Sequence, residues 1–352
     1  MKEVIGREVL RLPVTPENTR NTEGCFLRLK DGSLLHAYSH YGAKGIDDDP
    51  SDIGSIRSYD EGETWVERKT LYAHQGDENI MCPSLLRMEN GDMGLFYLWR
   101  RKTCDNGVDG VVIEIRLVRS ADEGQTWSEP VRCSPAEGYY IIENGHAIRL
   151  RSGRIIVPLA YHLPGNDYRG ITWYAKMCFM LSDDDGRTWF EASSRPSGPP
   201  PEWTMTGMQE TMVYQTETGR IRAFARTDLG CQYESYSDDD GITWSDPQPN
   251  RIFMSPICAM MIKKAADLTL AVLNPVPAHY DADLNMVNCR SPLVCMVSDD
   301  DGKTFPRIYA LDHNMNASYP DVFYDGGDSV LITYHACCDG IIRKIKLDDL
   351  RK

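Results

Sequence analysis

One short motif occurs five times along this chain and constrains its fold more than any other feature. The motif reads Ser-x-Asp-x-Gly-x-Thr followed by Trp or Phe, and its third-position aspartates are Asp60, Asp122, Asp184, Asp239 and Asp300. Successive aspartates are 62, 62, 55 and 61 residues apart. A nearly constant period of this length is typical of repeat architectures, in which one structural unit recurs and packs against its neighbours.

The motif has the composition of a tight turn between two strands. Its Ser and Asp side chains can accept hydrogen bonds from nearby backbone amides, and its Gly can adopt the positive φ that other residues tolerate poorly. The residues before it alternate or run apolar, as in IEIRLVRS and MCFMLSD, which is typical of strands. A calcium-loop interpretation of SDDDG is disfavoured, because the motif lacks the further ligands and the distal Glu of an EF-hand.

A second pattern lies between the copies of the motif. Segments such as LRLKDGSLLHAY and IRLRSGRIIVPLAY read as a strand, a polar turn with glycine, and another strand. One repeat unit therefore holds two hairpins, or four strands, which predicts the blade of a β-propeller. Dividing 352 residues by about 60 predicts six blades.

We therefore expect an all-β, six-bladed β-propeller of four-stranded antiparallel blades, formed by residues 1–352 as a single domain. Five blades carry the motif. The sixth is expected to close the ring by joining SVLITYHA and IIRKIKL to an N-terminal strand near Glu8–Leu12.

Composition restricts the classes of partner. The net charge of −14 argues against a nucleic-acid partner, because such a partner needs a basic face. No apolar run approaches the roughly 20 residues that span a membrane, and the N-terminal MKEVIGREVLRLP lacks the apolar core of a signal peptide. We expect no membrane partner and a cytoplasmic location, with a secreted protein trimmed of its signal as the alternative. The 11 cysteines include no CxxC pair, so we expect free thiols, no metal and no cofactor.

The repeated motif is similar to the Asp-box, or bacterial neuraminidase repeat, and the sequence resembles the sialidase superfamily over nearly its whole length. The resemblance implies a six-bladed propeller and an exo-acting, retaining glycoside hydrolase that releases a terminal sugar with a carboxylate at its anomeric carbon. It also implies a Tyr nucleophile activated by a Glu, because a carboxylate nucleophile would be repelled by the substrate's carboxylate. Arginines would bind that carboxylate, and an Asp would act as acid and then as base.

Three segments assign these roles to numbered residues. QETMVYQTETGRIRAFAR resembles the family's fourth-blade segment, which implies Glu210 as the partner of the nucleophile and Arg226 as a carboxylate ligand. NCRSPLVCMVSDDDGKTF implies Arg290 as a second carboxylate ligand, and NASYPDVFYDGGDSVLITYH implies Tyr319 as the nucleophile. The alternatives are a surface ion pair in the first segment, a charge on a rim loop in the second and a buried packing residue in the third.

The first blade departs from the family's pattern. Typical sialidases have an Arg-Ile-Pro motif before the first hairpin, and that Arg would fall near Thr22 or Glu23 in this chain. The segment Arg11–Pro13 reads Arg-Leu-Pro but lies too far upstream. Either Arg20 supplies a third carboxylate ligand, or Glu23 occupies the position and changes the ligand, since a Glu would oppose a carboxylate and favour an amine or a hydroxyl.

The acid/base Asp is expected in the loop KGIDDDPSDIGS, which would form either a lid over the pocket or a solvated surface loop. We choose Asp49, with Asp47 and Asp48 as close alternatives and Asp52 as a further candidate. His146, in ENGHAIRL, is a candidate substrate ligand or equally a structural histidine with a hydrogen-bonded ring.

The leading interpretation is a sialidase-type hydrolase that acts on a sialylated or other acidic glycan. One alternative keeps the reaction and changes the sugar to a deaminated sialic acid or a uronate. Another is a glycan-binding propeller without catalysis, and a third is a scaffold propeller. The Tyr, the Glu and two Arg favour an enzyme, because a lectin has no need of a Tyr–Glu pair. Linkage preference and oligomeric state stay open.

Overall fold

The structure is a computed structural model that describes residues 3–76, 79–105, 108–135, 138–167, 169–280, 283, 285–287 and 289–352. Strands make up nearly all of its regular structure, and α1 (Leu347–Leu350) is the single helix within those residues. No helix in this part of the chain has the length and apolar character needed to cross a membrane. The predicted all-β class is confirmed.

Four sheets consist of four antiparallel strands each. The first contains β2 (Asn21–Arg28), β3 (Leu34–Tyr41), β4 (Ser51–Ser58) and β5 (Val66–Tyr72). The second contains β15 (Gln209–Gln215), β16 (Ile221–Arg226), β17 (Cys231–Ser237) and β18 (Gln248–Met254). The third contains β19 (Met261–Ala265), β20 (Leu268–Leu273), β23 (Leu293–Ser298) and β24 (Arg307–Asp312). The fourth contains β25 (Ala317–Phe323), β26 (Ser329–Ala336), β27 (Asp339–Lys346) and β1 (Arg7–Leu12).

A nine-stranded sheet joins two further groups of four strands. One group is β6 (Asn79–Arg87), β7 (Met93–Asp105), β8 (Val108–Ser120) and β9 (Val131–Arg132). The other is β11 (Ile148–Arg149), β12 (Ile155–Pro164), β13 (Ile171–Ser182) and β14 (Phe190–Glu191). The strand β10 (Tyr139–Ile141) connects the groups, because it pairs with β12 and with β8. Strands β21 (His279–Tyr280) and β22 (Met286–Val287) pair separately. Counted in this way, the described strands fit the predicted six blades.

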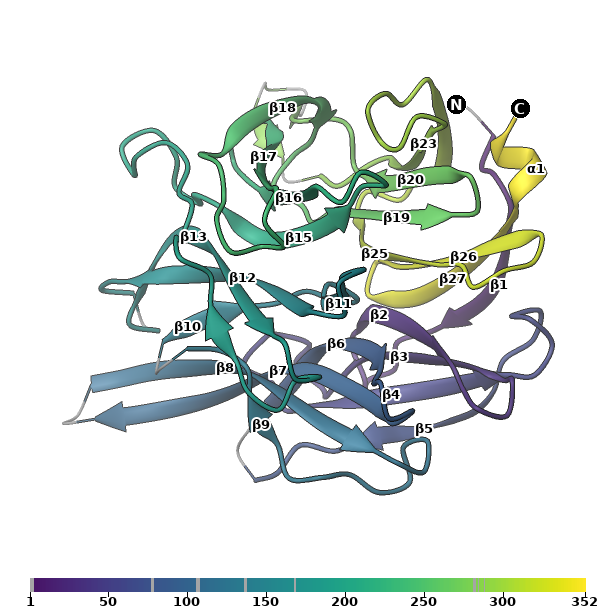
Figure 1. The fold of residues 1–352 in the computed structure, drawn as a ribbon, viewed down its shortest axis with the longest axis horizontal. Helices are drawn as coiled ribbons and strands as arrows, with labels where there is room; N and C mark the ends of the chain where they lie inside the picture. The colour runs from purple at the N-terminus through teal and green to yellow at the C-terminus, as the bar shows by residue number, and fades with distance from the viewer. Residues whose placement is uncertain are drawn as a thin grey trace.

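The first strands of the groups lie toward the centre of the molecule, and those last strands that Figure 1 labels lie toward its outside. Strands β2, β6, β15, β19 and β25 surround the centre, whereas β1, β5 and β18 lie at the periphery. Residues at the beginnings of the inner strands are therefore brought together from distant parts of the sequence.

The ring closes through the N-terminal strand. Strand β1 pairs antiparallel with β27, from Arg7 opposite Lys344 to Leu12 opposite Gly340. Figure 1 shows the two chain ends close together beside this pair. The predicted closing strand near Glu8–Leu12 is confirmed, and Leu12 is 3% exposed at the end of the seam.

Each Asp-box motif is a turn held by its own side chains. In the third copy, Asp184 accepts hydrogen bonds from the Thr188 amide at 2.8 Å and the Thr188 hydroxyl at 2.6 Å. Ser182 donates to Asp184 at 2.9 Å and accepts from the Gly186 amide at 2.7 Å. The Thr188 hydrogen bonds lower the pKa of Asp184 to about 2, so the carboxylate stays ionised and the turn stays closed over the neutral pH range. The same Thr-to-Asp bonds recur at Asp60, Asp122, Asp239 and Asp300.

The aromatic residue that ends the motif packs against the preceding blade. Trp244, in the fourth blade, stacks on Phe179 of the third with ring centroids 3.7 Å apart. Equivalent ring contacts join Trp189 to Phe96, Trp127 to Tyr72 and Phe305 to Phe253. The motif therefore supplies apolar contacts between blades as well as a turn.

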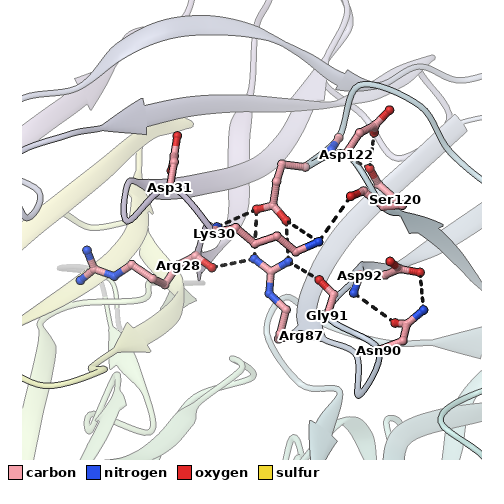
Figure 2. Close-up of polar contacts among 12 residues, drawn as sticks. Arg28, Lys30, Asp31, Arg87, Asn90, Gly91, Asp92, Ser120 and Asp122 are labelled. Atoms are coloured by element: carbon pink, nitrogen blue, oxygen red, sulfur yellow. Dashed lines mark hydrogen bonds and ion pairs between the residues drawn. The ribbon is translucent and has the colours of Figure 1, made fainter.

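The acidic residue in the fourth position of the motif links neighbouring blades. Glu123 has a positive φ of 58° and accepts hydrogen bonds from Arg87 of its own blade at 2.6 Å and from the Lys30 amide of the first blade at 3.2 Å. Figure 2 shows Lys30 and Arg87 converging at this junction, where Arg87 also donates to the carbonyl of Arg28.

The third copy of the motif repeats this inter-blade contact. Asp185 has a φ of 62° and accepts from Arg149 at 2.5 Å and from the Glu89 amide of the preceding blade at 3.2 Å. Arg119 of the preceding blade lies 3.4 Å from the same carboxylate. The fifth copy places Asp301 on the Glu217 amide at 2.6 Å. The acidic residue in the fourth position of the motif thus forms hydrogen bonds or ion pairs between adjacent blades in several copies.

Candidate active site

A cavity of about 200 Å³ lies where the first strands of several blades begin. The residues that line it include those with ionisable side chains, namely Arg20, Glu23, Asp47, Cys82, Tyr139, Glu143, His162, Arg169, Glu210, Arg226 and Tyr319. They come from five of the six strand groups or the loops beside them. This convergence makes the cavity the candidate active site.

A shared backbone feature points four of these side chains into the cavity. Glu23, Cys82, Glu210 and Tyr319 have positive φ values of 49°, 55°, 44° and 54°. Each lies at a register shift near the start of its inner strand, in β2, β6, β15 and β25 respectively. Such a β-bulge redirects a side chain that regular strand geometry would place in the sheet, and it carries local backbone strain.

Three of the predicted residues meet in one contact. The Tyr319 hydroxyl donates to Glu210 Oε1 at 3.3 Å, and Arg226 Nη1 lies 3.5 Å from the same hydroxyl. Arg226 and Glu210 also form a direct ion pair, and their side chains are 11% and 10% exposed. A half-buried tyrosine hydroxyl thus contacts a carboxylate and a guanidinium, an arrangement that can activate a phenol as a nucleophile.

The electrostatics of this contact keep Tyr319 protonated in the free protein. Burial, followed by the negative charge of Glu210, raises the pKa of Tyr319 above its usual value of 10.0, while Arg290 and Arg226 oppose the rise. The phenol therefore needs a proton acceptor before it can attack an electrophile, and Glu210 is in hydrogen-bond reach.

Arg290 lies beside the aromatic ring of Tyr319. Its guanidinium carbon is 5.1 Å from the Tyr319 ring centroid. The backbone is held on both sides, because the Arg290 amide donates to the Met315 carbonyl at 2.9 Å and Asn274 donates to the Arg290 carbonyl at 2.8 Å. The structure therefore brings Arg290 and Arg226 to the same tyrosine.

The first blade contributes an ion-paired arginine. Arg20 reaches the cavity, and its guanidinium binds both Glu23 and Asp47, the latter at 2.8 Å. Its Nε donates to Thr22 at 3.0 Å, and its Cζ lies 4.3 Å from the centroid of the Tyr41 ring. Arg20 and Glu23 therefore both occupy the first-blade position, where the sequence left a choice between them.

The acidic loop places its three adjacent aspartates differently. Asp47 lines the cavity and pairs with Arg20. Asp48 pairs with the buried Arg100. Asp49, our choice from the sequence, is 6% exposed, and its carboxylate accepts the amides of Lys44 at 2.7 Å and Gly45 at 3.1 Å.

The position of Asp49 is therefore that of a residue that shapes the loop. Because one Asp49 oxygen already caps two backbone amides, the loop is held closed by its own side chain. Asp47 is the member of the trio that faces the cavity. The remaining candidate, Asp52, binds the ring and amide of His74 at 2.7 and 2.9 Å.

His146 lies behind the cavity wall. It is 3% exposed, and its Nδ1–H donates to the Thr211 carbonyl at 3.1 Å, next to Glu210 in β15. Burial lowers the pKa of His146 to about 3, so the ring is neutral. These contacts favour the structural alternative, in which His146 supports the strand that carries Glu210.

Sequence reasoning assigned no role to three further polar residues of the cavity. Glu143 is 5% exposed, and burial, followed by the charges of Glu210 and Glu23, raises the pKa of Glu143 well above 4.5. The Cys82 thiol donates to Glu143 at 3.6 Å. Gln209 donates to the carbonyl of Trp173 at 2.8 Å. The signal that could have found Glu143 and Gln209 is their place next to His146 and Glu210.

Among the described residues, no group of three or more His, Cys, Asp or Glu side chains is arranged to hold a metal ion. Ten of the 11 cysteines are described as free thiols in the part of the chain that the structure covers, and eight of these ten are buried.

Residues 36–332 match the family described as the BNR repeat-like domain. The chain belongs to that family. The chain is also 25% identical over 299 residues to a sialidase of Micromonospora viridifaciens, covering 78% of the chain and 44% of the relative. It is 25% identical over 248 residues to a sialidase of Paraclostridium sordellii, covering 64% of the chain and 57% of the relative. The chain thus spans about half the length of these curated relatives.

Several solved structures have the same fold as this chain. The NanB sialidase of Streptococcus pneumoniae superposes with a TM-score of 0.73 at 13% identity, over 98% of this chain and 71% of that one. A leech intramolecular trans-sialidase superposes with a TM-score of 0.72 at 14% identity, over 99% of this chain and 71% of that one. These likenesses confirm the predicted sialidase-like β-propeller.

Proposed function

We propose that this protein is an exo-acting, retaining glycoside hydrolase of the sialidase type. The observation that carries the proposal is the contact of the Tyr319 hydroxyl with Glu210 at 3.3 Å and Arg226 at 3.5 Å inside a cavity. Curated relatives named as sialidases support the same reaction class. A tyrosine nucleophile is neutral, so it can approach a substrate that carries a carboxylate at the reacting carbon.

In the first step, Tyr319 Oη forms a bond to the anomeric carbon while the bond from that carbon to the leaving oxygen breaks. Glu210 takes the phenol proton, and Asp47 gives a proton to the leaving oxygen. Arg226 stabilises the negative charge that develops on the phenol oxygen. In the second step, water attacks the same carbon, Asp47 takes its proton, and Tyr319 leaves and recovers its proton from Glu210. Two inversions give retention of configuration.

The first substrate to consider is a terminal α-linked sialic acid. Arg226 and Arg290 flank Tyr319 and offer two cations to a carboxylate at the anomeric carbon. Trp173, which lines the cavity and is 47% exposed, offers an apolar surface to the leaving group. A deaminated sialic acid or a uronate would use the same two arginines.

A glycan-binding protein without catalysis is the second candidate, and a specific observation favours it. Glu23 stands beside Arg20, where a third free cation would strengthen carboxylate binding. This function needs no proton transfer, so it predicts sugar binding that survives removal of the Tyr319 hydroxyl.

The test is release of 4-methylumbelliferone from its α-N-acetylneuraminide by the wild type, Tyr319→Phe and Tyr324→Phe. Tyr324 is the matched control, because its hydroxyl lies 3.3 Å from the Gly327 carbonyl in the turn after the same strand. We expect turnover by the wild type and the control, and a loss of roughly 10³-fold or more in Tyr319→Phe. Equal activity of Tyr319→Phe and wild type would contradict the nucleophile. Binding of the sugar without turnover by the wild type would favour the second candidate.

A further inference from the structure

Glu23 has an unsatisfied oxygen inside the cavity. The residue is 2% exposed, and its positive φ of 49° at the β2 bulge turns it toward the cavity. One oxygen, Oε1, pairs with Arg20. The other, Oε2, is buried and has no hydrogen-bond partner among the residues that the structure describes. A buried carboxylate oxygen without a donor is costly, so a ligand that donates to it gains free energy.

The neighbours of Glu23 do not replace that donor. Arg20 is shared with Asp47 and Thr22, at 2.8 and 3.0 Å. Glu143 is a further buried carboxyl in the same cavity, and the charge of Glu23 is among the causes that raise the pKa of Glu143. This side of the cavity therefore has one guanidinium for the two carboxylates of Glu23 and Asp47, whereas the Tyr319 side has Arg226 and Arg290 for the one carboxylate of Glu210.

The two sides of the cavity make different demands on a sugar. A carboxylate placed between Arg226 and Arg290 meets cations. A carboxylate oxygen placed beside Arg20 meets Glu23, whose charge already compensates that arginine, and like charges in a buried site repel strongly. A hydroxyl, amide or ammonium group at the same place donates to Glu23 Oε2 without repulsion.

We infer that Glu23 makes this cavity select a sugar with a hydrogen-bond donor at the place beside Arg20, so that a carboxylate there binds more weakly than the neighbouring arginines alone would allow. The inference rests on the proposed function in placing the terminal sugar in this cavity. Glu23 is then the specificity-determining residue, and the group that it recognises is a hydroxyl, amide or ammonium group that donates a hydrogen bond to it.

The test compares two probes that differ in one group, the methyl α-glycoside of N-acetylneuraminic acid and its C1 carboxamide. The first presents a carboxylate, and the second presents a neutral group with N–H donors. Dissociation constants are measured by isothermal titration calorimetry for the wild type, Glu23→Gln and Glu23→Ala. The control is Glu8→Gln, since Glu8 also pairs with an arginine three residues away but lies in β1, the outermost strand of its sheet.

We expect the wild type to bind both probes, and the ratio of its two dissociation constants is the reference for the variants. In Glu23→Gln and Glu23→Ala, affinity for the carboxylate should rise roughly 10- to 100-fold relative to the carboxamide, because Arg20 loses its buried counter-charge. Glu8→Gln should leave the ratio unchanged. Because the ratio compares two ligands on one protein, a general loss of stability in a variant does not alter it.

A ratio within twofold of wild type in both Glu23 variants would overturn the inference. So would failure of the wild type to bind either probe. Turnover of the fluorogenic sialoside, measured on the same samples, separates the two proposals. Turnover with an unchanged ratio removes the inference and keeps the hydrolase, and a changed ratio without turnover does the reverse.

Discussion

Replacing Asp185 with asparagine should destabilise the junction between the second and third blades. The side chain is 3% exposed and contacts Arg149 at 2.5 Å, Arg119 at 3.4 Å and the Glu89 amide at 3.2 Å. Asparagine keeps the size of the side chain and tolerates the φ of 62°, so the substitution removes mainly the charge. It leaves Arg119 facing a neutral side chain and leaves Arg149 with Glu89, 3.4 Å away, as a carboxylate partner.

The expected magnitude follows from the exposure of those arginines. Removing one member of a fully buried ion pair costs about 3–5 kcal/mol. Arg149 and Arg119 are 21% and 16% exposed and can recover part of their hydration, so we expect about 2–3 kcal/mol. For a chain of 352 residues the entropy of unfolding is about 0.7 kcal/mol per degree. The melting temperature should therefore fall by about 3–4 °C.

The assay is thermal unfolding followed by circular dichroism, with Asp183→Asn as the matched control. Asp183 belongs to the same turn, but its side chain is 56% exposed and it pairs with Arg154 at the surface. That change should cost less than about 1 kcal/mol, or about 1 °C. Equal decreases in the melting temperature of the two variants would refute the conclusion that the acidic residue in the fourth position of the motif holds adjacent blades together.

Three further predictions concern the nucleophile, a buried carboxyl and the seam of the ring. Glu210→Gln should lower kcat/KM for the fluorogenic sialoside by roughly 10²–10⁴-fold, because a neutral amide cannot take the Tyr319 proton; a loss below tenfold would remove Glu210 as the base. Burial raises the pKa of Glu143, so its contribution to stability is present below its usual pKa of 4.5 and is lost as the pH rises through the folded-state pKa. The melting temperature of Glu143→Gln relative to that of the wild type should therefore rise between pH 5 and pH 8. A difference in melting temperature that stays constant over this range would count against a raised pKa of Glu143. Deletion of residues 1–12 should expose the edge of β27 and lower the melting temperature by several degrees, and an unchanged melting curve would show that β1 does not hold the ring closed.

The fold could be predicted because its information is local and repeated. Each Asp-box turn is satisfied within seven residues, from Ser182 to Thr188 in the third copy, so the same residue types must recur at the same spacing. The closing strand β1 was predictable for a related reason, since the last unit lacked one strand. The bridging strand β10 was not predicted, because its pairing with β8 and β12 depends on how two blades meet.

The site could be predicted in part. The resemblance of their segments to the sialidase superfamily implied Tyr319, Glu210 and Arg226, and the structure places the three side chains in contact. Which of the three adjacent aspartates faces the cavity depends on which carboxylate accepts the loop amides. Three neighbouring residues of the same type do not reveal this from the sequence. The pairing of Arg20 with Glu23 depends on the β-bulge between Thr22 and Cys25, and no residue pattern in the sequence predicts that bulge.

The bulges at the starts of β2, β6, β15 and β25 have a consequence for how such a protein changes its chemistry. The backbone, with its positive φ, decides where each side chain is presented, and it does so for residues as different as a carboxylate, a thiol and a phenol. A substitution at one of these positions exchanges the group shown to a ligand without rebuilding the strand beneath it. The bulges on the inner wall of the propeller therefore hold four positions whose side chains can be substituted while the backbone stays the same. Glu23 occupies one of these positions, and the chemistry of the cavity depends on which side chains occupy all four.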